Sequence, residues 1–589
     1  MLTKHLKRFL TTPASKVSNY EVIFWFSLSL IFATIYGTQA LAKAFRSEYI
    51  VQDDARQHVF WMRRFLDPEL FPNDLIADYF QSVAPLGYTT FYKLFAVLGI
   101  DPILLSKFLP VVLGLVTTSY FFGLCLQILP VPATGFIGAM LLNQNLWCRD
   151  DLASGTPRAF LYLLFLAFLY YLLRGEGKRP LLSASRLLCW GAIALQGLFY
   201  PQCVFISAGV LIVRLLSWED GKVRLSQRQS DYWFCAAGLA VALLVLLPYA
   251  LMPSQFGPII SVAQAKTLPE FWPGGRASFF DNNPWMYWLG GRSGMIPGML
   301  LTPVTLSAGL LLPILLRYPS RLPLVREIKS KIILLLQLII VSFCLFFTAH
   351  AVLFKLHLPN RYTQHSLRIV LILAAAIALT LLLDAVFYWA QNVTQSGLVI
   401  RQVLALGIVG LLGIAIVMYP SSLKNFPRTN YQTGTVPALY KFFSQQPKDS
   451  LIASLAKEAD NLPTFSQRSV LVSREYGIPY HIGYYHKFRE RALNLIQAQY
   501  SSNLAEVQNL IQKYGLDFWL LEQTSFEPEY IANNSWLKQF QPVATDTQVR
   551  LEQGSVPALV GLIDSCSVFK VKSFIVLGAE CIKNAHKTL

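Results

Sequence analysis

Long apolar runs alternate with short polar segments along the sequence, and these runs predict the architecture. About 20 apolar residues in a helix are enough to cross the hydrocarbon core of a bilayer. The first run covers 20–42 and follows a basic, polar segment, 1–19. Ten further runs cover 104–129, 133–147, 158–173, 184–200, 203–217, 233–252, 296–316, 332–353, 367–390 and 402–420. The pattern predicts a polytopic α-helical membrane protein with about eleven transmembrane helices within residues 20–420.

The polar connections between the runs indicate the side of the membrane on which each one lies. Cytoplasmic loops of membrane proteins are enriched in Lys and Arg. In this chain 17 of the 50 Lys and Arg residues fall in 1–19, 174–186, 218–232, 317–331 and 391–401. We therefore predict a cytoplasmic N-terminus in a plasma or inner membrane. The loops 43–102 and 253–295 and the region 421–589 are then exterior.

The region 421–589 mixes strand-like and helical patterns and has no run long enough to cross a membrane. The segments 469–473 (SVLVS) and 517–521 (DFWLL) are strand-like, whereas 503–514 has the apolar spacing of a helix. We predict a soluble extracytoplasmic α/β domain here. Its two cysteines, Cys566 and Cys581, could form a disulfide if the domain faces an oxidising compartment, and the sequence leaves this open.

Composition agrees with a membrane protein and narrows the choice of partners. Of the 589 residues 54% are apolar and only 14% are charged, whereas soluble domains carry about 25% charged residues. This excludes a soluble globular enzyme. The net charge of +17 would indicate nucleic acid in a soluble protein. Because much of the basic excess lies in the predicted cytoplasmic segments, we expect membrane lipids as partners and no nucleic acid.

Two pairs of acidic residues lie in predicted exterior loops. Asp53 and Asp54 closely follow the first run, and Asp150 and Asp151 lie between the third and fourth runs. A carboxylate in such a loop can take a proton from an acceptor hydroxyl or ligate a divalent cation, Mg²⁺ or Mn²⁺. Two simpler interpretations remain open. An Asp is a favoured helix N-cap, and the second pair fits a solvated turn that flanking arginines neutralise.

A basic cluster, HLPNRYTQHSLRI at 357–369, precedes the tenth run and contains Arg361, Tyr362 and His365. A guanidinium group can donate two parallel hydrogen bonds to a phosphate. The cluster is therefore suited to a lipid-linked phosphate whose tail stays in the bilayer. The alternative is that the arginine extends from a helix end to the lipid headgroups.

In combination, these features resemble the GT-C superfamily of integral-membrane glycosyltransferases. The matching features are the acidic motif Asp53-Asp54 in the first exterior loop, the second motif Asp150-Asp151, Arg361 with Tyr362 in a late exterior loop, and the exterior domain. The segment SREYGIPYHIGYYHKFRERALNLI at 473–496 is also similar to the C-terminal parts of uncharacterised bacterial members, including cyanobacterial ones.

The resemblance implies that a sugar is transferred from a polyprenyl-phosphate or polyprenyl-diphosphate donor to a glycan, lipid or protein acceptor on the exterior face, with inversion. It also implies roles for individual residues. Asp54 or Asp53 would be catalytic, and Arg361, His365 and Tyr362 would bind the donor phosphate. Asp150 and Asp151 would be auxiliary or would hold a metal ion. The first motif departs from the Asp-x-Asp or Glu-x-Asp of some members. The region 421–589 has no WWDYG sequence, which disfavours oligosaccharyltransferase activity on asparagine.

Other functions remain open at the level of the sequence. A polysaccharide ligase or polymerase would share the donor but rely on basic rather than acidic exterior residues. A lipid or sugar transporter would need charged residues at mid-membrane and paired repeats, whereas these runs contain almost no charges. A noncatalytic membrane scaffold would leave the exterior acidic pairs without a role.

Overall fold

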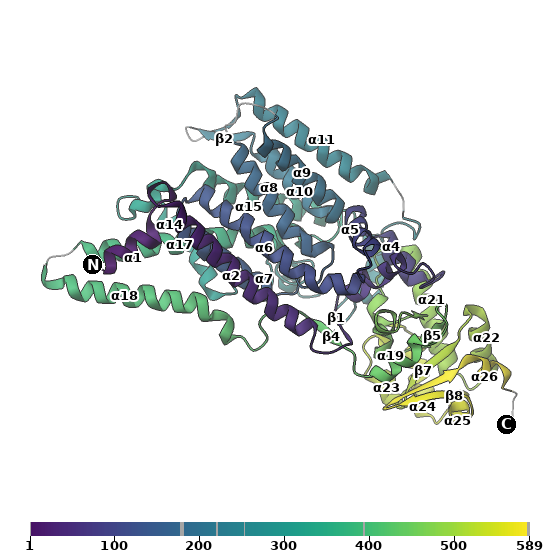
Figure 1. Ribbon diagram of the computed structural model, residues 1–589. Helices are drawn as coiled ribbons and strands as arrows, with labels where there is room; N and C mark the ends of the chain where they lie inside the picture. Colours follow the sequence, from purple (N-terminus) through teal and green to yellow (C-terminus); the bar gives the residue numbers. More distant parts are fainter. Residues whose placement is uncertain (1, 177–181, 220–221, 252–253, 393–394, 586–589) are drawn as a thin grey trace.

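The computed structural model describes residues 2–176, 182–219, 222–251, 254–392 and 395–585, and it is mostly helical (Figure 1). Within these ranges seven helices, counted with short flanking turns, are long and apolar enough to cross a membrane. They are α2 (Asn19–Ala44), α6 (Pro102–Ile128), α8 (Leu161–Gly175), α11 (Gln229–Leu251), α15 (Ile333–Ala351), α17 (Ser366–Gln391) and α18 (Gln395–Met418). The predicted fold class, a polytopic α-helical membrane protein, is confirmed.

The four other predicted spans form shorter helices. They are α7 (Pro132–Trp147), α9 (Ala184–Phe199), α10 (Gln202–Val213), and a 3-10 helix at Val304–Leu311 that continues into α14 (Leu312–Leu315). The helix α7 packs against α2, α6 and α17, and all but one of its residues are buried. Neighbouring helices rather than lipid surround α7, so its length need not match the thickness of the bilayer.

A five-stranded sheet forms the centre of the C-terminal region, in the order β6-β5-β7-β9-β8. The strands are β5 (Leu451–Ser454), β6 (Ser469–Val470), β7 (Phe518–Glu522), β8 (Ser567–Val571) and β9 (Phe574–Gly578). The strand β5 is parallel to both β6 and β7, whereas β9 is antiparallel to β7 and β8. The surrounding helices include α19 (Pro437–Ser444), α21 (Ile482–Gln499), α22 (Leu504–Tyr514), α24 (Val543–Glu552) and α26 (Ala579–Asn584).

The local predictions for this region are confirmed. The segment 469–473 contains β6, the segment 517–521 overlaps β7 with a shift of one residue, and the helical segment contains α22. The helix α22 ends at Gly515, whose φ of 67° is a left-handed conformation that glycine adopts without steric cost. Cys566 and Cys581 form a disulfide, a pairing that the sequence left open.

The C-terminal region is joined to one end of the helical bundle, whereas α1 (Leu2–Thr11) lies at the other end (Figure 1). The strand β1 (Ile50–Gln52), which follows α2, pairs with β4 (Tyr431–Thr433). An isolated bridge joins Ile259 to His481. The short helices α4 (Leu75–Ser82) and α5 (Leu86–Val97) also belong to the segment after α2, and the Tyr79 ring of α4 stacks on Tyr484 with a centroid distance of 3.7 Å. Both predicted exterior loops therefore contact the C-terminal region.

Candidate active site

Asp54 lies at the start of the short helix α3 (Ala55–His58), directly after β1. Its Oδ2 atom accepts a hydrogen bond of 2.6 Å from Nη2 of Arg158, a residue in the 3-10 turn that leads into α8. The Asp54 side chain forms no capping hydrogen bond with α3. The capping interpretation therefore does not describe this carboxylate, which joins two segments that are far apart in the sequence.

Arg158 also contacts the second acidic pair. Its Nε atom lies 3.2 Å from Oδ1 of Asp151, and its Nη2 atom lies 3.8 Å from Oδ1 of Asp150. Asp151 is 1% exposed and has a second cation nearby, because Nε of Arg149 lies 3.3 Å from its Oδ2. Three of the four predicted acidic residues thus surround one guanidinium group. The flanking arginines do neutralise the second pair, as the simpler interpretation proposed, but the turn is not solvated at Asp151.

Positive charge keeps two of these carboxyl groups ionised. Burial alone would raise the pKa of Asp54, but nearby charges outweigh burial and hold this pKa below its usual range. These charges belong to Arg158, His58, Arg276 and Arg361. Burial would also raise the pKa of Asp151, and the charges of Arg158 and Arg149 lower it instead. At neutral pH both carboxyl groups are therefore ionised.

The predicted phosphate-binding residues lie in α16 (Asn360–Gln364) and at the start of α17. Within the part of the chain that the structure describes, Nε of Arg361 and Nε2 of His365 are buried and have no hydrogen-bond partner. The Nδ1 atom of His365 lies 2.9 Å from the Tyr162 hydroxyl. The Tyr362 hydroxyl instead donates to the Leu356 carbonyl oxygen at 2.8 Å. Arg361 and His365 thus offer free nitrogen atoms, whereas the Tyr362 hydroxyl is already engaged.

Asp53 belongs to a different network, which is centred on Glu475. Its carboxylate pairs with Arg56, and Nη2 of Arg56 lies 3.3 Å from Oε2 of Glu475. Oε1 of Glu475 accepts a hydrogen bond of 2.6 Å from Nη2 of Arg276. The Nε2 atom of Gln57 donates to the Glu475 backbone carbonyl at 3.1 Å. Burial raises the pKa of Glu475 to about 7, although Arg276 and Arg56 act in the opposite direction. Glu475 therefore links both predicted exterior loops to the C-terminal region.

The sequence carries no signal for two of these contacts. The bond from Arg158 to Asp54 depends on which helices are neighbours, and the hydropathy pattern does not fix that. Glu475 lies in the segment REYG, whose spacing identifies no chemistry by itself. The local pair of Asp53 and Arg56 follows the i, i+3 spacing of a helical turn and could have been found from sequence.

A divalent cation does not fit the site as it is arranged. Among the described residues, no group of three or more His, Cys, Asp and Glu side chains could hold a metal ion. The Arg158 guanidinium lies among the carboxylates of Asp54, Asp150 and Asp151. A cation at this position would have to displace a guanidinium group that already balances their charge.

No protein-family model and no curated protein matches this sequence. Solved structures do match the fold. The Archaeoglobus fulgidus oligosaccharyltransferase, tethered with an acceptor peptide containing the NVT sequon, gives a TM-score of 0.54 at 12% identity, covering 89% of this chain and 72% of that chain. Archaeal oligosaccharyltransferase AglB from Archaeoglobus fulgidus, in complex with an inhibitory peptide and a dolichol-phosphate, gives a TM-score of 0.52 at 11% identity. The match covers 90% of this chain and 72% of that chain. ArnT from Cupriavidus metallidurans bound to undecaprenyl phosphate gives a TM-score of 0.42 at 12% identity. The match covers 96% of this chain and 98% of that chain.

The chain therefore shares its fold with the Archaeoglobus fulgidus oligosaccharyltransferase structures, and at the level of the fold this agrees with the resemblance noted in the sequence. A multi-pass membrane protein is confirmed with it. Fold alone does not define chemistry, because one fold can carry several activities.

Proposed function

We propose that this protein is an inverting membrane glycosyltransferase that moves a sugar from a polyprenyl-phosphate-linked donor to an acceptor on the exterior face. One observation carries the proposal. The ionised Asp54 carboxylate is held by Arg158 at the end of the bundle where the Arg361 charge also acts on it. A carboxylate for the acceptor and a guanidinium group for the donor phosphate are the two groups that such a transfer needs. The GT-C fold supports this assignment.

The donor phosphate is proposed to bind Arg361 and His365, whose free Nε and Nε2 atoms are buried near the acidic cluster. Both residues lie at the start of Asn360–Gln391, a segment long and apolar enough to cross a membrane, so the polyprenyl tail can remain in the bilayer. As the bond between the sugar and the phosphate breaks, negative charge grows on the leaving phosphate. The Arg361 guanidinium stabilises that charge.

Asp54 is proposed to act on the acceptor. The acceptor hydroxyl donates a hydrogen bond to the free oxygen of Asp54 while its own oxygen attacks the anomeric carbon opposite the phosphate. The new carbon–oxygen bond forms as the phosphate leaves, and the configuration inverts. Arg158 makes Asp54 a weak base at rest, so the proton moves to Asp54 late, when the attacking oxygen has become acidic. Asp150 and Asp151 assist by holding Arg158 in place.

We also propose the orientation and the domain boundaries. Residues 1–19 are cytoplasmic, 20–420 form the transmembrane domain, and 421–589 form an extracytoplasmic α/β domain. The concentration of Lys and Arg in 1–19 and in four loops supports this orientation. The Cys566–Cys581 disulfide supports it independently, because structural disulfides persist in oxidising compartments.

The test is Asp54→Asn, with Asp53→Asn as the matched control. The amide can still accept the hydrogen bond from Arg158 but cannot take a proton, so we expect the transfer rate to fall by about 10²-fold or more. Asp53 contacts Arg56 rather than Arg158, so its variant should keep most of the activity per amount of folded protein. Transfer is measured in membranes from cells that lack the native protein, together with accumulation of polyprenyl-linked sugar in lipid extracts. Full activity of Asp54→Asn would overturn the assignment.

Arg361→Gln separates the donor site from the acceptor site in the same assay. Loss of the guanidinium group should raise KM for the lipid-linked donor, while KM for the acceptor should change little. Arg361→Lys keeps the charge but not the planar pair of donors, so it should recover only part of the donor affinity. Equal effects of Arg361→Gln on both substrates would contradict this role.

A further inference from the structure

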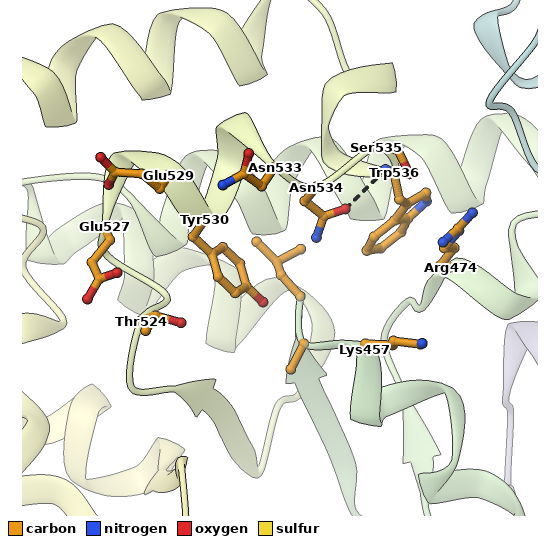
Figure 2. A pocket seen from close by; sticks show the side chains of 12 residues that line it. Lys457, Arg474, Thr524, Glu527, Glu529, Tyr530, Asn533, Asn534, Ser535 and Trp536 are labelled. Carbon is orange, nitrogen blue, oxygen red and sulfur yellow. Dashed lines mark hydrogen bonds between the residues drawn. The ribbon is translucent and has the colours of Figure 1, made fainter.

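A pocket of about 430 Å³ opens in the C-terminal region, outside the candidate active site (Figure 2). This volume is within the range of ligand sites in proteins, which is roughly 300–1,000 Å³. Its lining includes Lys457, Arg474, Glu529, Tyr530, Asn533 and Trp536. None of these residues takes part in the proposed transfer step.

The topology of the sheet places this pocket where ligands bind in other α/β sheets. The three parallel strands β5, β6 and β7 are each followed by a residue of the lining: Leu455, Arg474 and Thr524. The chain passes from β5 to β6 on one side and later to β7 on the other side of β5. The carboxyl ends of β5 and β7 therefore flank a topological switch point, the usual ligand position in open α/β sheets.

The charged side chains in the pocket are free for a ligand. Lys457 and Arg474 are exposed, and within the described residues neither side chain forms an ion pair or a hydrogen bond. The carboxylates of Glu527 and Glu529 are equally unpaired among the described residues. Figure 2 shows the two cationic side chains toward one end and the two carboxylates toward the other. The opposite charges thus do not neutralise each other across the pocket.

Aromatic and amide groups lie between the two charged ends. Tyr530 and Trp536 line this middle part, together with Asn533 and Asn534 (Figure 2). The Oδ1 atom of Asn534 accepts a hydrogen bond of 3.0 Å from the Trp536 backbone, which fixes the local turn and leaves the Nδ2 atom available. Aromatic rings can pack on the apolar faces of a sugar, while amides and carboxylates bind its hydroxyl groups. An extended peptide would instead pair with an outer strand, but no residue of β6 or β8 lines the pocket.

The loops that carry the two cations also reach the candidate active site. Asn461, four residues after Lys457, accepts a hydrogen bond of 3.0 Å from Nη1 of Arg56. Glu475, next to Arg474, is paired with the same guanidinium group. Arg56 in turn lies two residues after Asp54 in the sequence. A ligand in the pocket would therefore rest on loops that also contact the segment carrying the Asp53-Asp54 motif.

We propose that this pocket binds an acidic oligosaccharide segment of the acceptor, with a carboxylate or phosphate group held by Lys457 and Arg474. The inference rests on the proposed function, since it identifies the acceptor as an anionic glycan. Sugar hydroxyls face Glu527, Glu529 and Asn533, and the growing end of the glycan extends toward Asp54. The pocket acts as a subsite that holds the acceptor while the donor sugar is transferred.

The experiment measures binding of four probes to the full-length protein in nanodiscs by calorimetry. The probes are tetragalacturonate, a phosphorylated pentamannose, neutral maltotetraose and a tetraglutamate peptide. We expect at least one anionic sugar to bind tenfold or more tightly than both maltotetraose and tetraglutamate. The double variant Lys457→Gln/Arg474→Gln should weaken that binding by tenfold or more. The matched control is Lys441→Gln, an exposed lysine of α19 outside the pocket, and it should have no effect.

Each other outcome overturns the inference. Binding of no sugar probe, unchanged affinity in the double variant, or equal binding of tetraglutamate would each exclude a subsite for acidic glycans. The carboxylate and phosphate probes distinguish the two sources of the anion. Asp54→Asn separates this inference from the proposed function. If it abolishes transfer while no probe binds, only the subsite is wrong. If the probes bind as expected and Asp54→Asn is fully active, the catalytic assignment is wrong.

Discussion

Arg158 is the residue whose removal should disturb the candidate site most. Its guanidinium group lies 2.6 Å from Asp54, 3.2 Å from Asp151 and 3.8 Å from Asp150. In Arg158→Gln these carboxylates lose their common partner, and Asp151 is almost fully buried. Removing one partner of a buried ion pair costs about 3–5 kcal/mol. Because Arg149 remains 3.3 Å from Asp151, we expect a loss at the lower end, about 3 kcal/mol.

The pH dependence of this loss makes the reasoning testable. Without Arg158 the pKa values of Asp54 and Asp151 should rise, and protonation at low pH should remove the repulsion. The difference in thermal unfolding temperature from the wild type should therefore be large at pH 8 and small at pH 5, measured by intrinsic fluorescence in detergent. Arg149→Gln is the control, since Asp151 is the one carboxylate with which it forms an ion pair in the described structure, and it should lose less. An unfolding temperature equal to that of the wild type at pH 8 would refute the argument.

Two further variants test the C-terminal region. Glu475→Gln removes a carboxyl group whose pKa in the folded protein is about 7, above the ordinary 4.5. Ionising it costs stability, so between about pH 4.5 and 7 the wild type should lose on the order of 3 kcal/mol relative to the variant; parallel stability curves would contradict this. Cys581→Ser opens a disulfide that spans 15 residues and should cost about 3 kcal/mol. Reductant should lower the unfolding temperature of the wild type but not that of the variant, and no difference between the two proteins would contradict it.

The helical part of the fold could be predicted because apolar runs report burial in lipid directly. The run 296–316 shows the limit of that signal. Its composition is apolar, but the helix begins only at Val304. Pro297 and Pro303 lie in the first part of the run, and proline lacks the N–H group that a helix interior requires. Hydropathy averages over such positions and so extends the predicted span beyond the real helix.

The sequence predicted residues that belong to the candidate site, but it did not predict which side chains contact one another there. The basic loops suggested that both acidic pairs lie on one side of the membrane, and the structure brings Asp54, Asp150 and Asp151 to one arginine. The two neighbours Asp53 and Asp54 nevertheless point to different partners. Asp53 pairs locally with Arg56, whereas Asp54 reaches Arg158 on another helix. Tertiary packing alone determines which partner each aspartate contacts, and this packing could not be inferred from a single sequence.

The C-terminal region is a structural part of the site rather than an attached module. Arg56 is 6% exposed, and its charge is balanced by Asp53 from its own loop and by Glu475 from the C-terminal region. Asn461, also C-terminal, accepts a hydrogen bond from the same guanidinium group. A buried cation that loses such partners destabilises its surroundings strongly. The loop that carries Asp54 therefore owes its conformation in part to residues more than 400 positions later in the chain.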